Sequence, residues 1–226
     1  MTPMQLASML DMQDSMNTKV NPNWIAANNN WHRAICVEAV EAIEHHGWKW
    51  WKKQECDIAQ LRMELVDIWH FMLSAAIQQH GGAAQAQMEM LAELNLGSQP
   101  LRFDNRDYIL APVNLLEKLD LLVGLAAAQR TSLALFESIL ADCDMDWMDL
   151  YKQYVGKNVL NFFRQDHGYK AGSYIKMWHG REDNEHLLEV LERVDTGAED
   201  VRAVLYQSLK TRYESVLADG VMRSST

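Results

Sequence analysis

The sequence predicts an all-α protein, and three observations carry that prediction. Only four prolines and eleven glycines interrupt the 226 residues. Residues that favour helices, such as Ala, Leu, Met, Glu and Gln, are abundant. Apolar residues recur at helical spacing, and no segment shows the alternation typical of a β-strand. We therefore expect a helical bundle that forms a single domain over residues 1–226.

Three helices are predicted in the first third of the chain. The first covers residues 3–17. The second covers residues 31–46 and ends at Gly47, a residue suited to a helix C-terminus. The third covers residues 58–80 and follows Asp57, which is suited to an N-cap. Because the third segment is apolar on almost all sides, we expect it at the centre of the core.

The remaining elements follow weaker signals. A short helix is expected over residues 83–94, followed by a loop around residues 97–107. Gly168 and Gly172 mark another loop. Asp183 is a candidate N-cap, and Glu199 is expected to begin the last helix. The further helices are expected at about residues 108–130, 132–142, 147–166, 184–194 and 199–218.

Composition excludes several classes of protein. The formal net charge of −10 argues against general affinity for nucleic acid. No apolar run approaches the roughly 20 residues that span a bilayer, and the N-terminus lacks the features of a secretory signal peptide. The three cysteines have no metal-type spacing, so reduced thiols are expected at Cys36, Cys56 and Cys143. We therefore expect a soluble cytoplasmic protein with no membrane partner.

Positive charge is concentrated in residues 157–181. This segment holds five basic residues and a single acid, Asp166, which gives it a net charge of +4 within an acidic chain. Such a local patch favours a specific small anion as ligand. The alternative is a basic face that pairs with acids elsewhere in the fold.

Two pairs of carboxylates indicate a metal site. Glu38 and Glu41 lie three residues apart on the second predicted helix, as do Glu64 and Asp67 on the third, so each pair projects from one helix face. Four inward carboxylates would repel one another without a cation between them, and oxygen ligands favour Mg²⁺, with Mn²⁺ as a further candidate. The alternative is a solvated acidic stripe. His70 continues the series, but a di-iron site is disfavoured because that design needs Glu-x-x-His motifs on two helices.

Five segments in a fixed order resemble a known family. They are QDSMN at 13–17, EAVE at 38–41, WKWWK at 48–52, ELVDIWHF at 64–71 and KNVLNFFRQDHGYKAGSY at 157–174. Together they resemble the dimeric, all-α dUTPases, within the MazG-like all-α nucleoside triphosphate pyrophosphohydrolases. The resemblance covers residues 4–80 and 150–187 well and the rest of the chain poorly.

The resemblance implies roles for the charged residues. Glu38, Glu41, Glu64 and Asp67 match the family's Mg²⁺ ligands, on helices within about 31–80. One glutamate acts as general base in that family, and Glu41 is favoured over Glu38 or Glu64. Within about 150–187, the expected phosphate contacts are Lys157, Asn161, Arg164, Tyr169 and Lys176. Asn161 is also a candidate metal ligand, and loop packing or solvent charge is the alternative for Tyr169 and Lys176.

Base recognition is expected from Gln13, Asn17, Trp51, His70 and Phe71. Amide side chains can match both donors and acceptors of uracil, and an aromatic face can stack on the ring. For His70 and Phe71, ordinary core packing is the alternative. Trp48 and Trp50 are expected to be packing residues.

The resemblance implies Mg²⁺-dependent hydrolysis of dUTP to dUMP and pyrophosphate, by metal-activated water, with dUDP as a second substrate. It also implies a homodimer, which the apolar helices at 57–80 and 108–141 favour because they carry more apolar surface than a small bundle easily hides. Because the phosphate-binding segment lies far along the chain from the metal helices, we expect an appended, mobile helical part that closes on the nucleotide as a lid. Two alternatives stay open: a pyrophosphohydrolase that prefers another pyrimidine such as dCTP, and a non-catalytic helical nucleotide-binding protein.

Overall fold

The computed structural model describes residues 1–97, 99–194 and 201–224. Within these residues, nine helices and two short antiparallel hairpins form the regular structure, so the all-α prediction is confirmed. The chain forms two compact units, Met1–Tyr151 and Lys152–Thr226. None of the helices in the described ranges combines the length and the apolar character needed to cross a membrane.

The first four helices lie close to their predicted positions. Asp57 caps its helix through the Gln60 amide as predicted, and Gly47 ends the preceding helix with a φ of 83°. That φ lies in the region where glycine carries no steric penalty. The bounds are Pro3–Val20 for α1, Trp31–His46 for α2, Ile58–His80 for α3 and Ala83–Asn95 for α4.

A β-hairpin occupies part of the segment that was predicted to be a loop. β1 (Leu101–Phe103) pairs with β2 (Arg106–Tyr108) across Asp104 and Asn105, whose φ values are 46° and 57°. Positive φ at both central residues is the geometry of a tight hairpin turn. The prediction of no strands is therefore wrong here, because three-residue strands are too short for alternation to be visible.

Two helices and the start of a third complete the first unit. α5 (Leu115–Ala127) begins later than predicted, because the Asn114 side chain caps it by accepting a hydrogen bond from the Glu117 amide. α6 (Leu133–Asp142) agrees with its prediction. α7 (Trp147–Asp166) also agrees, and it begins in the first unit and continues into the second.

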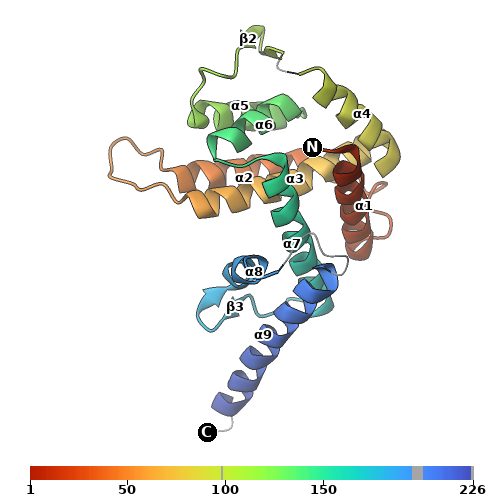
Figure 1. The fold of residues 1–226 in the computed structure, drawn as a ribbon, viewed down its shortest axis with the longest axis vertical. Helices are drawn as coiled ribbons and strands as arrows, with labels where there is room; N and C mark the ends of the chain where they lie inside the picture. Colours follow the sequence, from red (N-terminus) through yellow and green to blue (C-terminus); the bar gives the residue numbers. More distant parts are fainter. Residues whose placement is uncertain (98, 195–200, 225–226) are drawn as a thin grey trace. The chain divides into compact units, whose positions relative to one another are not determined.

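The α2–α3 pair forms the centre of the first unit. α2 packs along α3, α5 packs against α2, and α1 packs against α3 and α4 (Figure 1). Trp69 of α3 stacks on Phe136 of α6 with ring centroids 5.4 Å apart and contacts Trp147 of α7 at 5.3 Å. The seam between α2 and α3 is the place where the two predicted carboxylate pairs can meet.

The apolar side chains of α3, α5 and α6 are mostly buried inside this unit. The expectation of surplus apolar surface on these helices is therefore wrong, because α1, α2 and α4 cover it. Exposed apolar residues lie elsewhere, among them Val37 and Val40 on α2, at 50% and 48% exposure. The homodimer stays a prediction that rests on the resemblance.

The second unit is built around aromatic rings. Phe163 of α7 lies edge-on to Trp178, Tyr206 and Tyr213, with ring centroids 5.3–5.9 Å apart. Its other elements are β3 (Met177–Trp178), which pairs with β4 (Arg181–Glu182), followed by α8 (Asp183–Leu191) and α9 (Val201–Ser224).

Two expectations about the second unit change. Glu182, and not Asp183, is the N-cap of α8, through a capping box with Glu185. Asp183 is the first residue of the helix and is fully buried, for a reason that the candidate site explains. The expected start of the last helix at Glu199 lies outside the described residues, and its end at Ser224 lies beyond the predicted residue 218.

Candidate functional site

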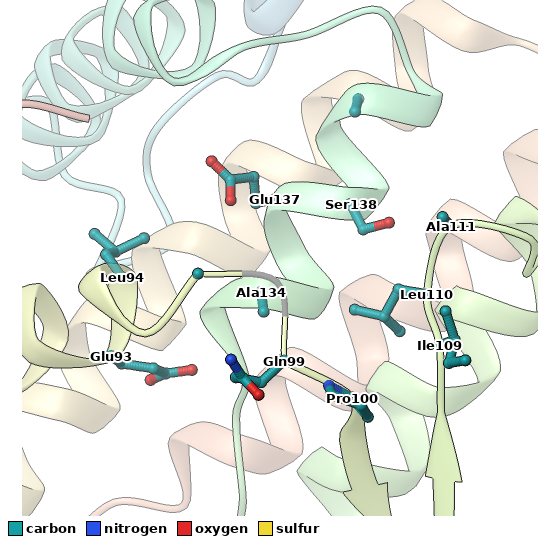
Figure 2. A pocket seen from close by; sticks show the side chains of 12 residues that line it. Glu93, Leu94, Gln99, Pro100, Ile109, Leu110, Ala111, Ala134, Glu137 and Ser138 are labelled. Atoms are coloured by element: carbon teal, nitrogen blue, oxygen red, sulfur yellow. The ribbon is translucent and has the colours of Figure 1, made fainter.

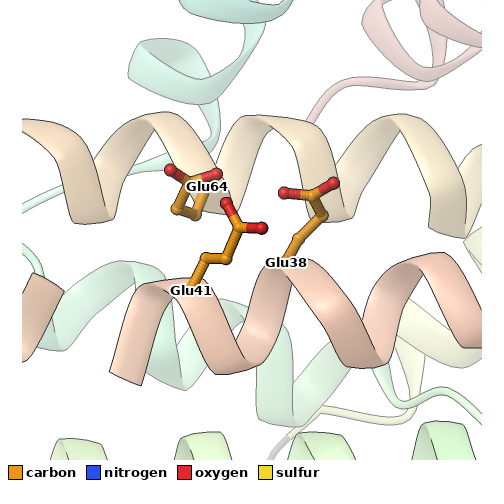
Figure 3. A group of neighbouring side chains, drawn as sticks. All are labelled: Glu38, Glu41 and Glu64. Atoms are coloured by element: carbon orange, nitrogen blue, oxygen red, sulfur yellow. The ribbon is translucent and has the colours of Figure 1, made fainter. Parts of the chain in front are cut away.

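Three of the four predicted metal ligands meet in the seam between α2 and α3. Glu38 and Glu41 project from α2 toward Glu64 of α3 (Figure 3). One carboxylate oxygen of each residue lies within 4.8 Å of those of the other two. The three-residue spacing on α2 directs both of its glutamates to the same face. The packing of α2 along α3 then places that face opposite Glu64.

The environment of these carboxylates favours a cation. Glu64 is buried, Glu38 is half-buried and Glu41 is exposed. Burial, followed by the charges of Asp67, Glu64 and Glu41, raises the pKa of Glu38 to about 8. Asp67 lies outside the group of three but is close enough to act on Glu38.

These residues fit a hard divalent cation. Their donors are all carboxylate oxygens, the ligands that Mg²⁺ and Mn²⁺ prefer. A cation among them would offset the mutual repulsion that now raises the pKa of Glu38.

One neighbour of this cluster was missed in the sequence. His45 Nε2 lies 3.3 Å from Glu64 Oε1. The signal was present, because His45 follows Glu41 by four residues and Glu38 by seven, which is one face of a helix.

The predicted base-recognition residues Gln13, Asn17 and His70 form a buried polar network with Ser74. His70 Nδ1 lies 2.7 Å from Gln13 Oε1. Gln13 Nε2 donates to Asn17 Oδ1 at 3.1 Å and to Ser74 Oγ at 2.9 Å. Asn17 Nδ2 also donates to Ser74 Oγ, at 2.9 Å. The packing of α1 against α3 therefore brings Gln13 and Asn17, which lie four residues apart on α1, to His70, which lies 57 residues after Gln13. Ser74 was not predicted.

Aromatic rings adjoin the network. Trp31 stacks on Phe71 with centroids 6.2 Å apart, and Trp24 meets Trp31 edge-on at 5.8 Å. Trp31 Nε1 donates to Gln78 of α3, at 3.0 Å. Phe71 thus belongs to an aromatic group that begins with the buried Trp24, and neither tryptophan was predicted to take part.

Trp51 lies elsewhere in the first unit. It belongs to the loop after α2, at the end of the α2–α3 pair that is distant from α1 (Figure 1). It is 57% exposed and contacts Trp48 and Trp50 edge-on. The packing expectation is wrong for Trp50, which is 89% exposed. The structure does not bring Trp51 to the network of Gln13, so its role in base stacking stays a prediction.

Three of the predicted phosphate contacts lie together on α7, in the second unit. Lys157 is buried and donates through Nζ to Asn184 Oδ1 at 3.1 Å. Arg164 donates to Asn161 at 3.3 Å and to Asn184 at 3.2 Å. Arg164 also forms a two-point pair with Asp183, with distances of 2.8 and 2.7 Å. The predicted row on α7 therefore exists, and the start of α8 supplies acceptors that were not predicted.

The other two predicted phosphate contacts lie at the edge of this group. Tyr169 is 48% exposed, and the Arg164 guanidinium carbon lies 5.8 Å from the centre of its ring. Lys176 forms an exposed ion pair with Glu182 at 3.0 Å. The carboxylates belong to the first unit and the α7 row to the second, and their action on one nucleotide stays a prediction.

A separate cavity of about 290 Å³ lies in the first unit, beside α4, the β1–β2 hairpin and α6 (Figure 2). Two carboxylates line this cavity, and each already accepts a hydrogen bond from another residue of the first unit. Glu93 accepts a hydrogen bond from the Leu133 amide, and Glu137 accepts one from the Trp147 indole. Burial raises the pKa of Glu93. We assign no role to this cavity.

Comparison with known proteins identifies a family. A family model described as dUTPase matches residues 5–169, a span that includes the carboxylates, the amide network and the α7 row. A search of curated proteins gave no match.

Proposed function

The chain belongs to the dUTPase family and is a dUTP diphosphatase, and we propose that its hydrolysis of dUTP to dUMP and pyrophosphate depends on Mg²⁺ and on the cluster of Glu38, Glu41 and Glu64. The meeting of these carboxylates in the α2–α3 seam is the observation that carries the proposal. We propose dUDP as a second substrate, on the basis of the resemblance alone.

Glu38, Glu41, Glu64 and Asp67 would hold the metal. A bound Mg²⁺, or Mn²⁺ in its place, would neutralise phosphate charge and make a water easier to ionise. The raised pKa of Glu38 supports this assignment, since the crowded carboxylates are under an electrostatic load that a cation would offset.

Glu41 is proposed as the general base. It is the solvent-exposed member of the cluster, so water reaches its carboxylate directly. In the proposed reaction, a water oxygen attacks the α-phosphorus of dUTP, its proton passes to Glu41, and pyrophosphate leaves. His45 lies against Glu64 and would help to orient that carboxylate.

Gln13, Asn17 and His70 are proposed to read uracil, and Phe71 to present an aromatic face to it. Support comes from their assembly into one network beside the aromatic group. Along α3, Glu64 precedes His70 by six residues, which corresponds to a rise of roughly 9 Å. This spacing suits a nucleotide whose base and phosphates occupy neighbouring positions. Trp51 is kept as a proposed stacking residue.

Lys157, Asn161, Arg164, Tyr169 and Lys176 are proposed to contact the phosphates. Cationic and amide donors on one helix face suit phosphate oxygens, whose negative charge they would stabilise. The pairing of Arg164 with Asp183 supports a fixed orientation of the guanidinium.

A homodimer and a cytoplasmic location complete the proposal. The family resemblance supports the homodimer, and the exposed Val37 and Val40 offer an apolar strip on α2. The cysteines Cys36, Cys56 and Cys143 are free, which fits a reducing compartment. Light scattering tests the dimer, which would have about twice the 26.0 kDa mass of one chain; a particle of one chain's mass contradicts it.

The function is tested by pyrophosphate release from dUTP, dCTP, dTTP and UTP, each with Mg²⁺ and with EDTA. We expect turnover of dUTP alone, and only with Mg²⁺. Preference for dCTP would leave the metal site in place and overturn the base-recognition assignment. Turnover of dUTP in EDTA would overturn the metal dependence.

A further inference from the structure

Ser74 is the central member of the buried network that contains Gln13, Asn17 and His70. It lies on α3 one turn after His70, and its exposed fraction is 0%. Its Oγ lies 2.9 Å from Gln13 Nε2, from Asn17 Nδ2 and from the carbonyl oxygen of His70. These three contacts use the full capacity of a hydroxyl, which has one donor and two acceptor lone pairs.

The direction of each bond follows from one fixed partner. A backbone carbonyl can only accept, so the Ser74 hydroxyl must donate its proton to the carbonyl of His70. Toward the two amides, Oγ can then only accept. Both Gln13 and Asn17 must therefore present their NH₂ groups to Ser74. This conclusion does not depend on how amide nitrogen and oxygen are distinguished in coordinates.

The fixed amides in turn orient the histidine. With its nitrogen held by Ser74, Gln13 presents Oε1 to His70 Nδ1 at 2.7 Å. An amide oxygen only accepts, so Nδ1 carries a proton, and in the neutral imidazole Nε2 is then the nitrogen with the lone pair. The hydroxyl of Ser74 thus determines the hydrogen-bonding pattern of three other side chains.

We propose that Ser74 is a positioning residue that sets the preference for uracil over cytosine, by holding Asn17 and Gln13 in one amide orientation. The proposal rests on the proposed function, in which these amides read the base. Uracil presents an N–H between two carbonyl oxygens, whereas cytosine presents an NH₂ beside a bare ring nitrogen. An amide must turn by 180° to change from one edge to the other.

The network penalises that turn. Within the described residues, the bonds to Ser74 and Gln13 use one N–H and one lone pair of Asn17, which leaves one of each for a ligand. Turning Asn17 would set its oxygen against the Ser74 oxygen and its NH₂ against the NH₂ of Gln13. Two hydrogen bonds would become two repulsive contacts in a buried site, where unsatisfied polar groups are costly.

A purely structural role predicts a different result. A buried serine that bonds to the carbonyl four residues earlier is a common helix feature, and its loss would lower stability without changing which base is read. The test is therefore substrate preference, and Ser132 provides the matched control. Ser132 is also a buried serine of the first unit, and its hydroxyl caps α6 by accepting a hydrogen bond from the Leu135 amide.

The experiment compares kcat/KM for dUTP and dCTP in the full chain and in Ser74→Ala, Ser74→Thr and Ser132→Ala. In Ser74→Ala, we expect the preference for dUTP to fall roughly tenfold to a hundredfold, mainly through a higher KM for dUTP. Ser74→Thr keeps the hydroxyl and should restore part of the preference. An unchanged preference in Ser74→Ala, or an equal loss in Ser132→Ala, would overturn the proposal. If Ser74→Ala does not fold, Ser74→Cys takes its place. Its preference for dUTP should fall less than that expected for Ser74→Ala, because a thiol still accepts hydrogen bonds, although weakly.

A second readout does not need catalysis. In the nucleotide-free protein, ¹⁵N NMR of the His70 ring, assigned with His70→Phe, should show the proton on Nδ1 in the wild type. Ser74→Ala should shift part of the population to the other tautomer, and no shift would overturn the orienting role. A wild type that hydrolyses none of the four nucleotides would overturn the proposed function, whereas the NMR result would still decide whether Ser74 orients the amides.

Discussion

Arg164 and Asp183 form a two-point ion pair inside the second unit, with Nε–Oδ2 and Nη2–Oδ1 distances of 2.8 and 2.7 Å. The Asp183 side chain is fully buried and that of Arg164 is 11% exposed. The Tyr174 hydroxyl donates to the same carboxylate at 2.7 Å. The pair joins α7 to the first residue of α8, so a proposed phosphate contact also holds the unit together.

We expect Asp183→Ala to destabilise the second unit by about 3 to 5 kcal/mol, because it leaves the Arg164 charge buried without its partner. Urea unfolding and hydrogen exchange in α7 and α8 measure this loss. The control is Lys176→Ala, which breaks an exposed pair worth about 1 kcal/mol or less. Equal losses in the two variants would contradict the structural role of the Arg164 pair.

Stability should also depend on pH through Asp183. Burial acts to raise the pKa of its carboxyl, but hydrogen bonds from Arg164 and Tyr174 and the Arg164 charge outweigh burial and lower it from 3.8. Because the folded pKa is the lower one, this contribution is present above pH 3.8 and is lost as pH falls through the folded value. Urea midpoints between pH 5 and pH 2.5 should decline less steeply in Asp183→Asn than in the wild type. Parallel declines would show that other carboxyls determine the acid sensitivity.

Glu41→Gln should leave the fold intact and lower Mg²⁺-dependent dUTP turnover roughly hundredfold to ten-thousandfold, the usual contribution of a general base. The matched control is Glu44→Gln, one turn later on α2, where the carboxylate pairs with Lys49 at 2.6 Å and accepts from the Trp48 indole. Pyrophosphate release measures both variants. Full activity in Glu41→Gln would transfer the role of base to another residue of the cluster.

Glu38→Gln should stabilise the metal-free protein while it weakens the response to metal. Replacing this crowded carboxyl by a neutral amide removes repulsion from Asp67, Glu64 and Glu41. In EDTA at pH 8, we expect Tm to rise by about 2 to 4 °C, which corresponds to about 1 kcal/mol, and Mg²⁺ to add less stability than it adds to the wild type. Thermal unfolding with and without Mg²⁺ checks both effects. A lower Tm in EDTA would mean that Glu38 is held by favourable contacts.

Local signals in the sequence were enough to predict most helices. Asp57, Gly47 and the apolar periodicity gave the bounds of α2 and α3 closely, because caps and periodicity act within a few residues of the chain. The β1–β2 hairpin was missed because its strands are only three residues long. The Phe103 ring of this hairpin packs against Gly124 of α5. A Cβ atom added at Gly124 would lie 3.1 Å from that ring.

The candidate site was predicted only in part. The carboxylate pairs could be found from their spacing, and the amides only through the family resemblance. Ser74 was not found, because one small polar residue on an apolar helix carries no pattern. Asp183 was taken for a helix cap, because its partner Arg164 lies nineteen residues earlier and only the packing of α7 on α8 shows the pair.

The helices, and the faces from which Glu38, Glu41 and Glu64 project, can be predicted from the chain alone, since both depend on short-range backbone geometry. Packing brings one oxygen of each of these three carboxylates within 4.8 Å of the others, and burial together with the charges of Asp67, Glu64 and Glu41 raises the pKa of Glu38 to about 8. Only the tertiary structure decided this, and it also decided that Ser74 joins two helices through one hydroxyl. Electrostatic and hydrogen-bond energies depend on distances between groups remote in the chain, and packing alone sets those distances.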